Sequence, residues 1–153
     1  MKKILLFSLP LTILIGGFSL KGLLPKKDTV LNHIALHVYN LQKSSLFYQQ
    51  IIQLDTVPEP FKDGKHIWLR ISSSSTLHLI SGAEKNTIHD KYVHHCFSVA
   101  SLSVFISRLD KEGIPYEDWS GNKLAVTNRV DGIKQIFFQD PDGYWIEVND
   151  DNK

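Results

Sequence analysis

Three histidines and one glutamate stand at positions from which they could bind a metal ion together. His33, His78, His94 and Glu147 each fall in the middle of a segment in which apolar and polar residues alternate. Such alternation is typical of a β-strand with one buried face, and each candidate ligand lies opposite the apolar face. Imidazoles with one carboxylate suit a divalent transition metal that keeps open positions for water or substrate. The pattern therefore predicts a metal centre, and its ion would supply the cationic partner that a buried Glu147 needs.

Each candidate also has a simpler explanation. A histidine on a strand is more often a hydrogen-bonded structural residue than a metal ligand, and for His78 both interpretations stay open. Glu147, taken alone, could lie on a solvated face of its strand. Only one of His94 and His95 can bind the ion, because successive side chains of a strand point to opposite faces. We choose His94, because its face also carries small residues whereas His95 shares a face with larger apolar ones.

Three further side chains are predicted to line a substrate pocket: His37, Trp68 and Trp145. His37 shares a strand face with His33 and could line the pocket or relay protons, although a solvated strand end explains it equally well. The two tryptophans could wall the pocket or pack in the core. Cys96 is expected to be buried in its strand and chemically inert.

The elements that must position these residues can be read from the periodicity of the chain. Asn40 can cap an amphipathic helix that ends near residue 54, and Ser101 can cap a second helix that ends at Gly113. Asp140-Pro141-Asp142-Gly143 has the residue types of a type I β-turn between two antiparallel strands. Leu41, Leu46, Phe47 and Ile51 are expected to form the apolar side of the first helix. Strands are expected at 31–38, 67–72, 77–80, 93–99, 116–119, 133–139 and 144–149, with a strand or extended loop at 123–130.

The order strand, helix and three strands occurs twice along the chain. The first strands of the two halves even look alike, His-Ile-Ala-Leu-His-Val from residue 33 and His-His-Cys-Phe-Ser-Val from residue 94. Such a repeat indicates a duplicated unit whose halves pack together. Because two helices cannot cover both faces of so much sheet, one face should curve around a cavity. We therefore predict an α+β fold of two βαβββ modules, with curved mixed sheets around a metal-containing cavity.

The amino-terminal segment has the composition of a targeting signal. Lys2-Lys3 precede an uncharged, mostly apolar run that ends at Leu20, and Gly17 and Ser19 have the spacing of a cleavage site. The alternative is a retained membrane anchor, for which a run broken by Pro10 is marginal in length. We expect an exported protein, periplasmic or extracellular, or one anchored to a membrane by its N-terminus. The expected division is a signal peptide or anchor at 1–22, a linker at 23–30 and the folded domain at 31–150.

Charge and cysteine content argue against a nucleic-acid partner and exclude a disulfide within the chain. The chain of 153 residues has 17 Lys and Arg against 16 Asp and Glu, which gives no electrostatic reason to expect a nucleic-acid partner. Cys96 is the only cysteine, so no disulfide can form within the chain. The length suits a single domain with a hydrophobic core. We therefore expect one domain and no nucleic-acid partner.

These modules and motifs resemble the vicinal oxygen chelate superfamily, which includes glyoxalase I, fosfomycin-resistance thiol transferases, extradiol dioxygenases and bleomycin-resistance proteins. The resemblance spans about residues 31–150. It implies His33, His94 and Glu147 as metal ligands, and it places His78 where glyoxalase I has a fourth ligand, usually a glutamate. The implied ion is Zn, Ni, Mn, Co or Fe. The motifs that carry the resemblance are Asn32-His33-Ile34-Ala35-Leu36, Leu46-Phe47-Tyr48, His94 to Val99 and Phe138 to Glu147.

The resemblance also implies a type of chemistry. Members of the superfamily chelate a substrate through adjacent oxygens on a metal that acts as a Lewis acid. We expect a glyoxalase-like, metal-dependent lyase or isomerase, with Glu147 as the catalytic residue that shuttles a proton, and we expect a homodimer. The alternatives are a dioxygenase or thiol transferase of the same superfamily, and a non-catalytic protein that binds a drug or metabolite.

One departure from glyoxalase I bears on the substrate. Glyoxalase I carries an arginine four residues after its first ligand, where it grips a glutathione carboxylate. This chain has His37 at that position, which is a weaker and pH-dependent carboxylate clamp. A glutathione adduct is therefore only one candidate substrate, and an exported protein would meet little glutathione.

Overall fold

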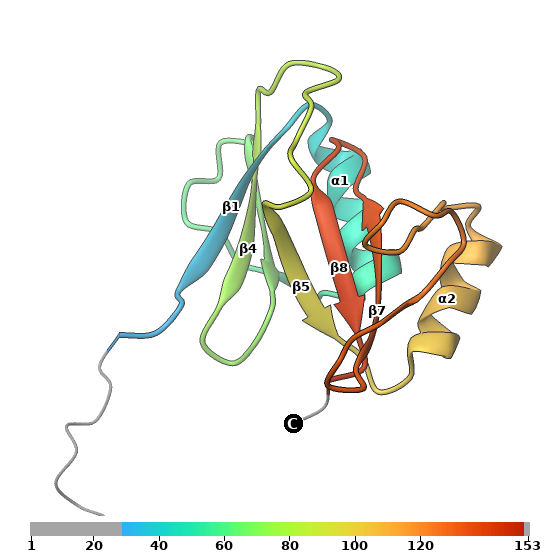
Figure 1. Ribbon diagram of the computed structural model, residues 1–153. Helices are drawn as coiled ribbons and strands as arrows, with labels where there is room; N and C mark the ends of the chain where they lie inside the picture. Colours follow the sequence, from blue (N-terminus) through green and yellow to red (C-terminus); the bar gives the residue numbers. More distant parts are fainter. Residues whose placement is uncertain (1–28, 152–153) are drawn as a thin grey trace, which may run out of the picture. The chain divides into compact units, whose positions relative to one another are not determined.

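Two separate four-stranded sheets form the framework of residues 29–151, the part of the chain that the computed structural model describes (Figure 1). The first sheet has the order β1 (His33–Val38), β4 (Thr76–Ser81), β3 (His66–Arg70) and β2 (Thr56–Val57). The second repeats this order with β5 (His94–Ser98), β8 (Trp145–Asn149), β7 (Lys134–Gln139) and β6 (Thr127–Asn128). In each sheet the first pair of strands is parallel and the others are antiparallel. The predicted α+β fold of two βαβββ modules is confirmed, and its mixed sheets are not joined into a closed barrel.

The first helix differs from its prediction in the side that it buries. It consists of α1 (Leu41–Phe47) and a π-helical turn, η2 (Tyr48–Ile52), and the Asn40 side chain accepts a hydrogen bond from the Lys43 amide as the predicted N-cap. Leu46 is 53% exposed, so its predicted place in the apolar side is wrong, whereas Ser44 and Tyr48 are fully buried. Both buried side chains hydrogen-bond to the turn at residues 140–143, which explains why polar groups occupy this side of the helix.

The second helix, α2 (Leu102–Lys111), follows its prediction closely. The Ser101 side chain accepts a hydrogen bond from the Val104 amide, and Gly113 has a φ of 64° just beyond the helix, as a left-handed cap requires. The predicted strand at residues 116–119 is wrong, because Glu117 forms only isolated bridges with Lys123 and Phe137. The short strand β2 was not predicted, since two residues carry no detectable alternation.

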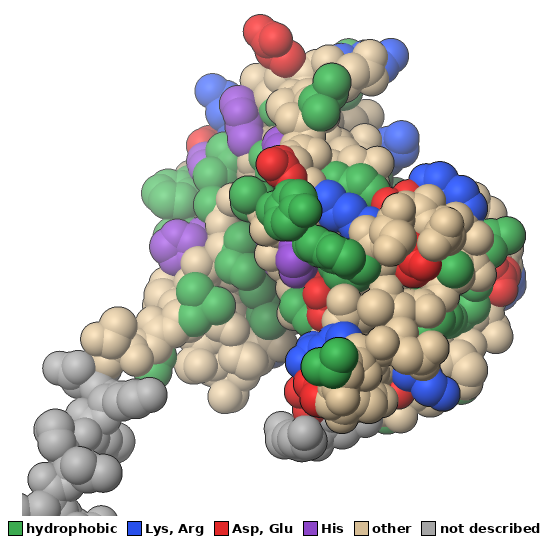
Figure 2. All heavy atoms as spheres, viewed as in Figure 1, with side chains coloured by type: hydrophobic (Ala, Val, Ile, Leu, Met, Phe, Trp, Pro, Cys, Tyr) green, Lys and Arg blue, Asp and Glu red, His purple; other side chains and the backbone are tan. Residues whose placement is uncertain are grey.

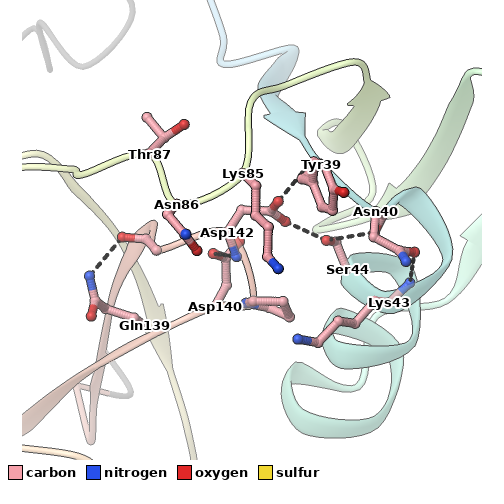
Figure 3. A pocket seen from close by; sticks show the side chains of 12 residues that line it. Tyr39, Asn40, Lys43, Ser44, Lys85, Asn86, Thr87, Gln139, Asp140 and Asp142 are labelled. Carbon is pink, nitrogen blue, oxygen red and sulfur yellow. Dashed lines mark hydrogen bonds between the residues drawn. The ribbon is translucent and has the colours of Figure 1, made fainter.

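One hydrophobic core joins the two modules. Phe47 in α1 lies 6.3 Å from Phe138 in β7, measured between ring centroids. At the same place the Tyr48 hydroxyl donates to Asp140 Oδ2 at 2.9 Å, inside the core. Asp142 accepts from the Tyr39 amide and from the Ser44 hydroxyl (Figure 3). The modules are therefore held together by the first helix and by the turn at residues 140–143.

The turn at residues 140–143 joins two antiparallel strands, β7 and β8, as predicted. The Gly143 amide donates to the Asp140 carbonyl at 3.1 Å, which closes a four-residue turn, and Asp140 Oδ1 accepts from the amides of Asp142 and Tyr144. Gly143 has a φ of 87°, and a Cβ at this position would lie only 3.0 Å from the Thr87 carbonyl oxygen. The turn therefore requires glycine both for its backbone conformation and for the close approach of residue 87.

Asp140 should make the stability of the protein depend on pH. Burial raises the pKa of this carboxyl from its ordinary value of 3.8 to about 6. A carboxyl whose pKa is higher in the folded protein holds its proton more tightly when folded. The free energy of unfolding therefore falls as the pH rises from about 4 to about 6, by on the order of 2 kcal/mol from this group.

We expect Asp140→Asn to remove this contribution, because the amide keeps the acceptor for the turn and has no proton to lose. Urea unfolding of wild type and variant at pH 4 and pH 7 measures the effect. The variant should lose less stability than the wild type between the two values. Equal changes in the two proteins would show that Asp140 does not titrate in this range.

The expected signal peptide or anchor at 1–22 and nearly all of the expected linker at 23–30 lie outside the described residues. Within residues 29–151, no helix combines the length and the apolar character that crossing a bilayer requires. The expectations of export or N-terminal anchoring therefore stay predictions.

Candidate metal centre

The parallel pairing of β5 with β8 brings two of the predicted ligands together. Cys96 lies opposite Glu147 in the register of these strands, and His94 lies opposite Trp145. Side chains at alternate positions share one face of the sheet, so His94 and Glu147 point the same way. His94 Nε2 lies 3.3 Å from Glu147 Oε2. His95 points to the opposite face, where its Nε2 is buried and has no hydrogen-bond partner among residues 29–151.

The hydrogen bonds of His94 indicate what belongs between these two atoms. His94 Nδ1 lies 2.9 Å from the carbonyl oxygen of Lys91, and a carbonyl can only accept, so Nδ1 carries a proton. In the neutral ring the Nε2 atom then presents a lone pair to Glu147 Oε2. Two acceptors facing each other at this distance need a proton or a metal ion between them. The donor set therefore fits a metal ion of the kind that binds imidazole and carboxylate ligands.

The other oxygen of Glu147 is held by two neighbouring side chains. Oε1 accepts from Asn149 Nδ2 at 3.0 Å and from Cys96 Sγ at 3.2 Å, and Glu147 is only 8% exposed. The prediction that Cys96 is buried is wrong, because it lies on the exposed face of an outer strand. Desolvation and the hydrogen bond to Glu147 raise the pKa of the Cys96 thiol to about 12, so the thiol stays protonated and acts as a donor.

The other two predicted ligands meet on the first sheet. The rings of His33 and His78 stack with centroids 4.3 Å apart, and Trp68 stacks on the other side of His78 at 4.0 Å. His78 Nε2 lies 2.8 Å from Thr76 Oγ1, and burial is the main cause of its lowered pKa. The His78 ring thus lies between the rings of His33 and Trp68, whereas His33 itself is exposed at the start of β1.

One chain alone does not bring all four predicted ligands to one point. Within residues 29–151, no three His, Cys, Asp or Glu side chains stand close enough to hold one ion. Figure 2 shows histidines at several separate places on the visible face rather than in one cluster. The reason is that the modules pack through α1 and the core, so each sheet presents its own ligand-bearing face. The four-residue ligand set stays a prediction.

The predicted pocket residues are divided between the same two faces. Trp68 pairs with His78 across the first sheet, and its indole nitrogen is buried with no hydrogen-bond partner in the described part of the chain. Trp145 lies opposite His94, and its indole nitrogen donates to the His89 carbonyl at 3.1 Å. The backbone of His37 exchanges hydrogen bonds with the Tyr144 hydroxyl, which fixes this end of β1 against the second module.

Sequence reasoning missed the residues that support the two close ligands. Asn149 follows Glu147 by two residues and therefore shares its strand face, which was the signal in the sequence for this contact. The Ser98 hydroxyl and the Asp151 amide donate to Asn149 Oδ1, which turns Nδ2 of the amide toward Glu147. Lys91 supplies its carbonyl to His94, and its ammonium donates to buried Glu117 at 2.8 Å. No pattern in the sequence predicts the contacts of Lys91 with His94 and Glu117.

A cavity of about 510 Å³ lies beside the turn at residues 140–143, at the junction of the modules (Figure 3). Most of its lining residues have polar side chains, and none of them is a predicted metal ligand. The residues that form it are Tyr39, Asn40, Lys43, Ser44, Lys85, Asn86, Thr87, Gln139, Asp140, Pro141, Asp142 and Gly143.

Known proteins are similar to this chain in sequence and in fold. A protein named Glyoxylase I 4 from Arabidopsis thaliana is 28% identical over 131 residues, which cover 81% of this chain and 72% of that protein. Metallothiol transferase FosB from Shouchella clausii is 29% identical over 123 residues, 78% of each chain. The structure of Oxidase ChaP-H2 superposes with a TM-score of 0.66 at 21% identity, covering 80% of this chain and 94% of that one.

A family model gives the assignment directly. The model of the Glyoxalase/Bleomycin resistance protein/Dioxygenase superfamily matches residues 30–148, which include both modules and all four predicted ligands. This match agrees with the repeated sheet order and with the resemblance carried by the strand motifs. The chain therefore belongs to the glyoxalase/bleomycin resistance protein/dioxygenase superfamily.

Proposed function

We propose that this protein is a metal-dependent enzyme of glyoxalase-like type, a lyase or isomerase that acts on a small substrate with two adjacent oxygen atoms. The observation that carries the proposal is the pair of facing acceptors, His94 Nε2 and Glu147 Oε2, at 3.3 Å. The outer atom of each group is already hydrogen-bonded, to Lys91 in one case and to Asn149 and Cys96 in the other. This arrangement orients both inner atoms for an ion, as the supporting partners of metal ligands do in proteins.

His94, Glu147 and His33 would hold the ion, with His78 as a neighbouring ring or a fourth ligand. A divalent Zn, Ni, Mn, Co or Fe ion bound there would act as a Lewis acid on the substrate oxygens. Glu147 would leave the ion transiently to transfer a proton, and Oε2 is the atom that we expect to accept and return it, because Oε1 is occupied by two donors. Trp68 and Trp145 would exclude water on the two sides of the substrate.

We further propose that a second copy of the chain completes the site. β1 and β5 are outer strands of their sheets, and each carries one predicted ligand at its exposed face. In a dimer with two-fold symmetry, every contact between the copies occurs twice, the second time with the roles of the two copies exchanged. If the face of β1 meets the face of β5 in the partner, His33 of one copy joins His94 and Glu147 of the other. The dimer would then hold two equivalent sites.

A thiol transferase is the second candidate. Two relatives bear such names, the metallothiol transferase FosB and the glutathione transferase FosA of Serratia marcescens, at 29% and 26% identity. His37 stands where a lyase specific for glutathione would have an arginine, so a smaller or uncharged thiol adduct suits this chain better. We also propose that residues 1–22 direct export or anchor the protein to a membrane, where glutathione is scarce.

Metal analysis and an activity screen test these proposals. Purified wild type and His94→Ala would each be loaded with Zn, Ni, Mn, Co or Fe and assayed with α-ketoaldehyde thiol adducts, fosfomycin plus thiols, and catechols. We expect metal-dependent turnover of a thiol adduct by the wild type and none by the variant. Turnover of fosfomycin would favour the transferase, and iron-dependent turnover of catechols the dioxygenase. Absence of bound metal would leave only a binding function.

A further inference from the structure

A series of hydrogen bonds, each donated toward the next acceptor, leads from Ser98 and Asp151 through Asn149 to Glu147. The Ser98 hydroxyl and the Asp151 amide both donate to Asn149 Oδ1, at 3.1 and 3.2 Å. Because that oxygen accepts both bonds, the amide nitrogen of Asn149 must face the other way. It donates to Glu147 Oε1 at 3.0 Å and to Cys96 Sγ at 3.1 Å. The orientation of the Asn149 amide thus follows from groups outside the site.

Cys96 completes the arrangement from the neighbouring strand. Its thiol has one hydrogen, and its sulfur lies 3.2 Å from Glu147 Oε1 while accepting from Asn149. Sulfur accepts the amide hydrogen, so the thiol hydrogen is free for the carboxylate oxygen. Oε1 therefore receives two donors from two strands, whereas Oε2 faces His94 Nε2. The two oxygens of the Glu147 carboxylate therefore differ: Oε1 accepts hydrogen bonds, and Oε2 stays available to bind an ion.

We propose that Cys96 and Asn149 are positioning residues that make Glu147 a ligand through one oxygen only. This inference rests on the metal site proposed above. With Oε1 occupied, Glu147 contributes only Oε2 and cannot chelate the ion through both oxygens. One oxygen of Glu147 and one nitrogen each from His94 and His33 would leave positions on a divalent ion open for two adjacent substrate oxygens. The network thus favours substrates that chelate in the way the superfamily's chemistry requires.

Removal of either donor should weaken metal binding. We expect Cys96→Ala and Asn149→Ala to lower the affinity for Co²⁺ and Zn²⁺ about 10- to 100-fold, as loss of a supporting partner typically does. Cys96→Ser restores a hydroxyl donor at the same place and should bind within a few-fold of the wild type. Asn128→Ala changes an exposed asparagine of β6 and is the control for loss of an amide. Isothermal titration calorimetry of the full-length variants measures these affinities, and thermal unfolding shows that each variant is folded.

The visible and near-ultraviolet spectra of the Co²⁺ protein separate positioning from direct ligation. A protonated thiol that only supports Glu147 gives no thiolate-to-cobalt charge-transfer band, and we expect none in the wild type. A band that Cys96→Ala abolishes would make Cys96 a ligand and overturn the proposal. Equal metal affinity of wild type, Cys96→Ala and Asn149→Ala would overturn it as well, while leaving the proposed function intact. Failure of the wild type to bind either ion would instead overturn the proposed metal site itself.

Discussion

We expect Glu147→Gln to lower kcat/KM about 100- to 10,000-fold, the usual effect of losing a group that transfers a proton. Glutamine has the same shape but lacks the charge and the basicity of the carboxylate. In the metal-free variant its amide oxygen can still accept from Asn149 and Cys96 while its amide nitrogen donates to His94 Nε2, and bound metal would displace only the second of these contacts. The variant should therefore fold normally and keep some metal. Steady-state kinetics of the metal-loaded protein, with metal content determined in parallel, measure the effect.

Glu84→Gln is the matched control, because Glu84 is an exposed carboxylate in the loop between β4 and β5. It should leave kcat/KM unchanged. If Glu147→Gln retained full turnover with its metal bound, Glu147 would not be the proton-transferring group. If turnover and metal were lost together, metal binding would be the main contribution of the carboxylate. Comparison of the two measurements thus separates the two roles of Glu147.

A mixture of two inactive variants should regain activity if the site is shared between copies. His33→Ala removes the ligand from the first sheet, and His94→Ala removes one from the second. In a dimer that contains one copy of each, one site loses both ligands and the other is intact. Random assortment gives such dimers half of the time, so the mixture should recover about a quarter of wild-type activity. Activity is measured after unfolding and refolding the two variants together.

The control for this experiment combines two variants that affect the same sheet, His94→Ala with Glu147→Gln. Every site in their mixed dimers lacks one of these groups, so no activity should return. Recovery in neither mixture would mean that a single copy holds the complete site, whereas activity of His33→Ala by itself would mean that His33 is not a ligand. Recovery in both mixtures would mean that His94 and Glu147 of one site also come from different copies.

Strong local patterns decided much of the fold from the sequence. Alternation of apolar and polar residues identified β1, β3, β4, β5, β7 and β8. The N-capping Ser101 and Gly113 just beyond the last turn located the two ends of α2. These signals are local, because a strand face or a helix cap depends on residues a few positions apart. The same locality explains the errors. Leu46 fits an apolar stripe by spacing, but the turn at residues 140–143 draws Ser44 and Tyr48 to the buried side instead.

By itself, the sequence determined which strand faces carry His33, His78, His94 and Glu147, since side-chain direction alternates along any strand. The tertiary structure alone decided which of them meet. Parallel pairing of β5 with β8 placed Cys96 across from Glu147 and turned Glu147 Oε2 toward His94, while stacking placed His78 between His33 and Trp68. Contacts between residues 50 positions apart depend on strand register and module packing, which no short segment encodes. For the same reason, the partners of the Glu147 carboxylate became visible only in the folded chain.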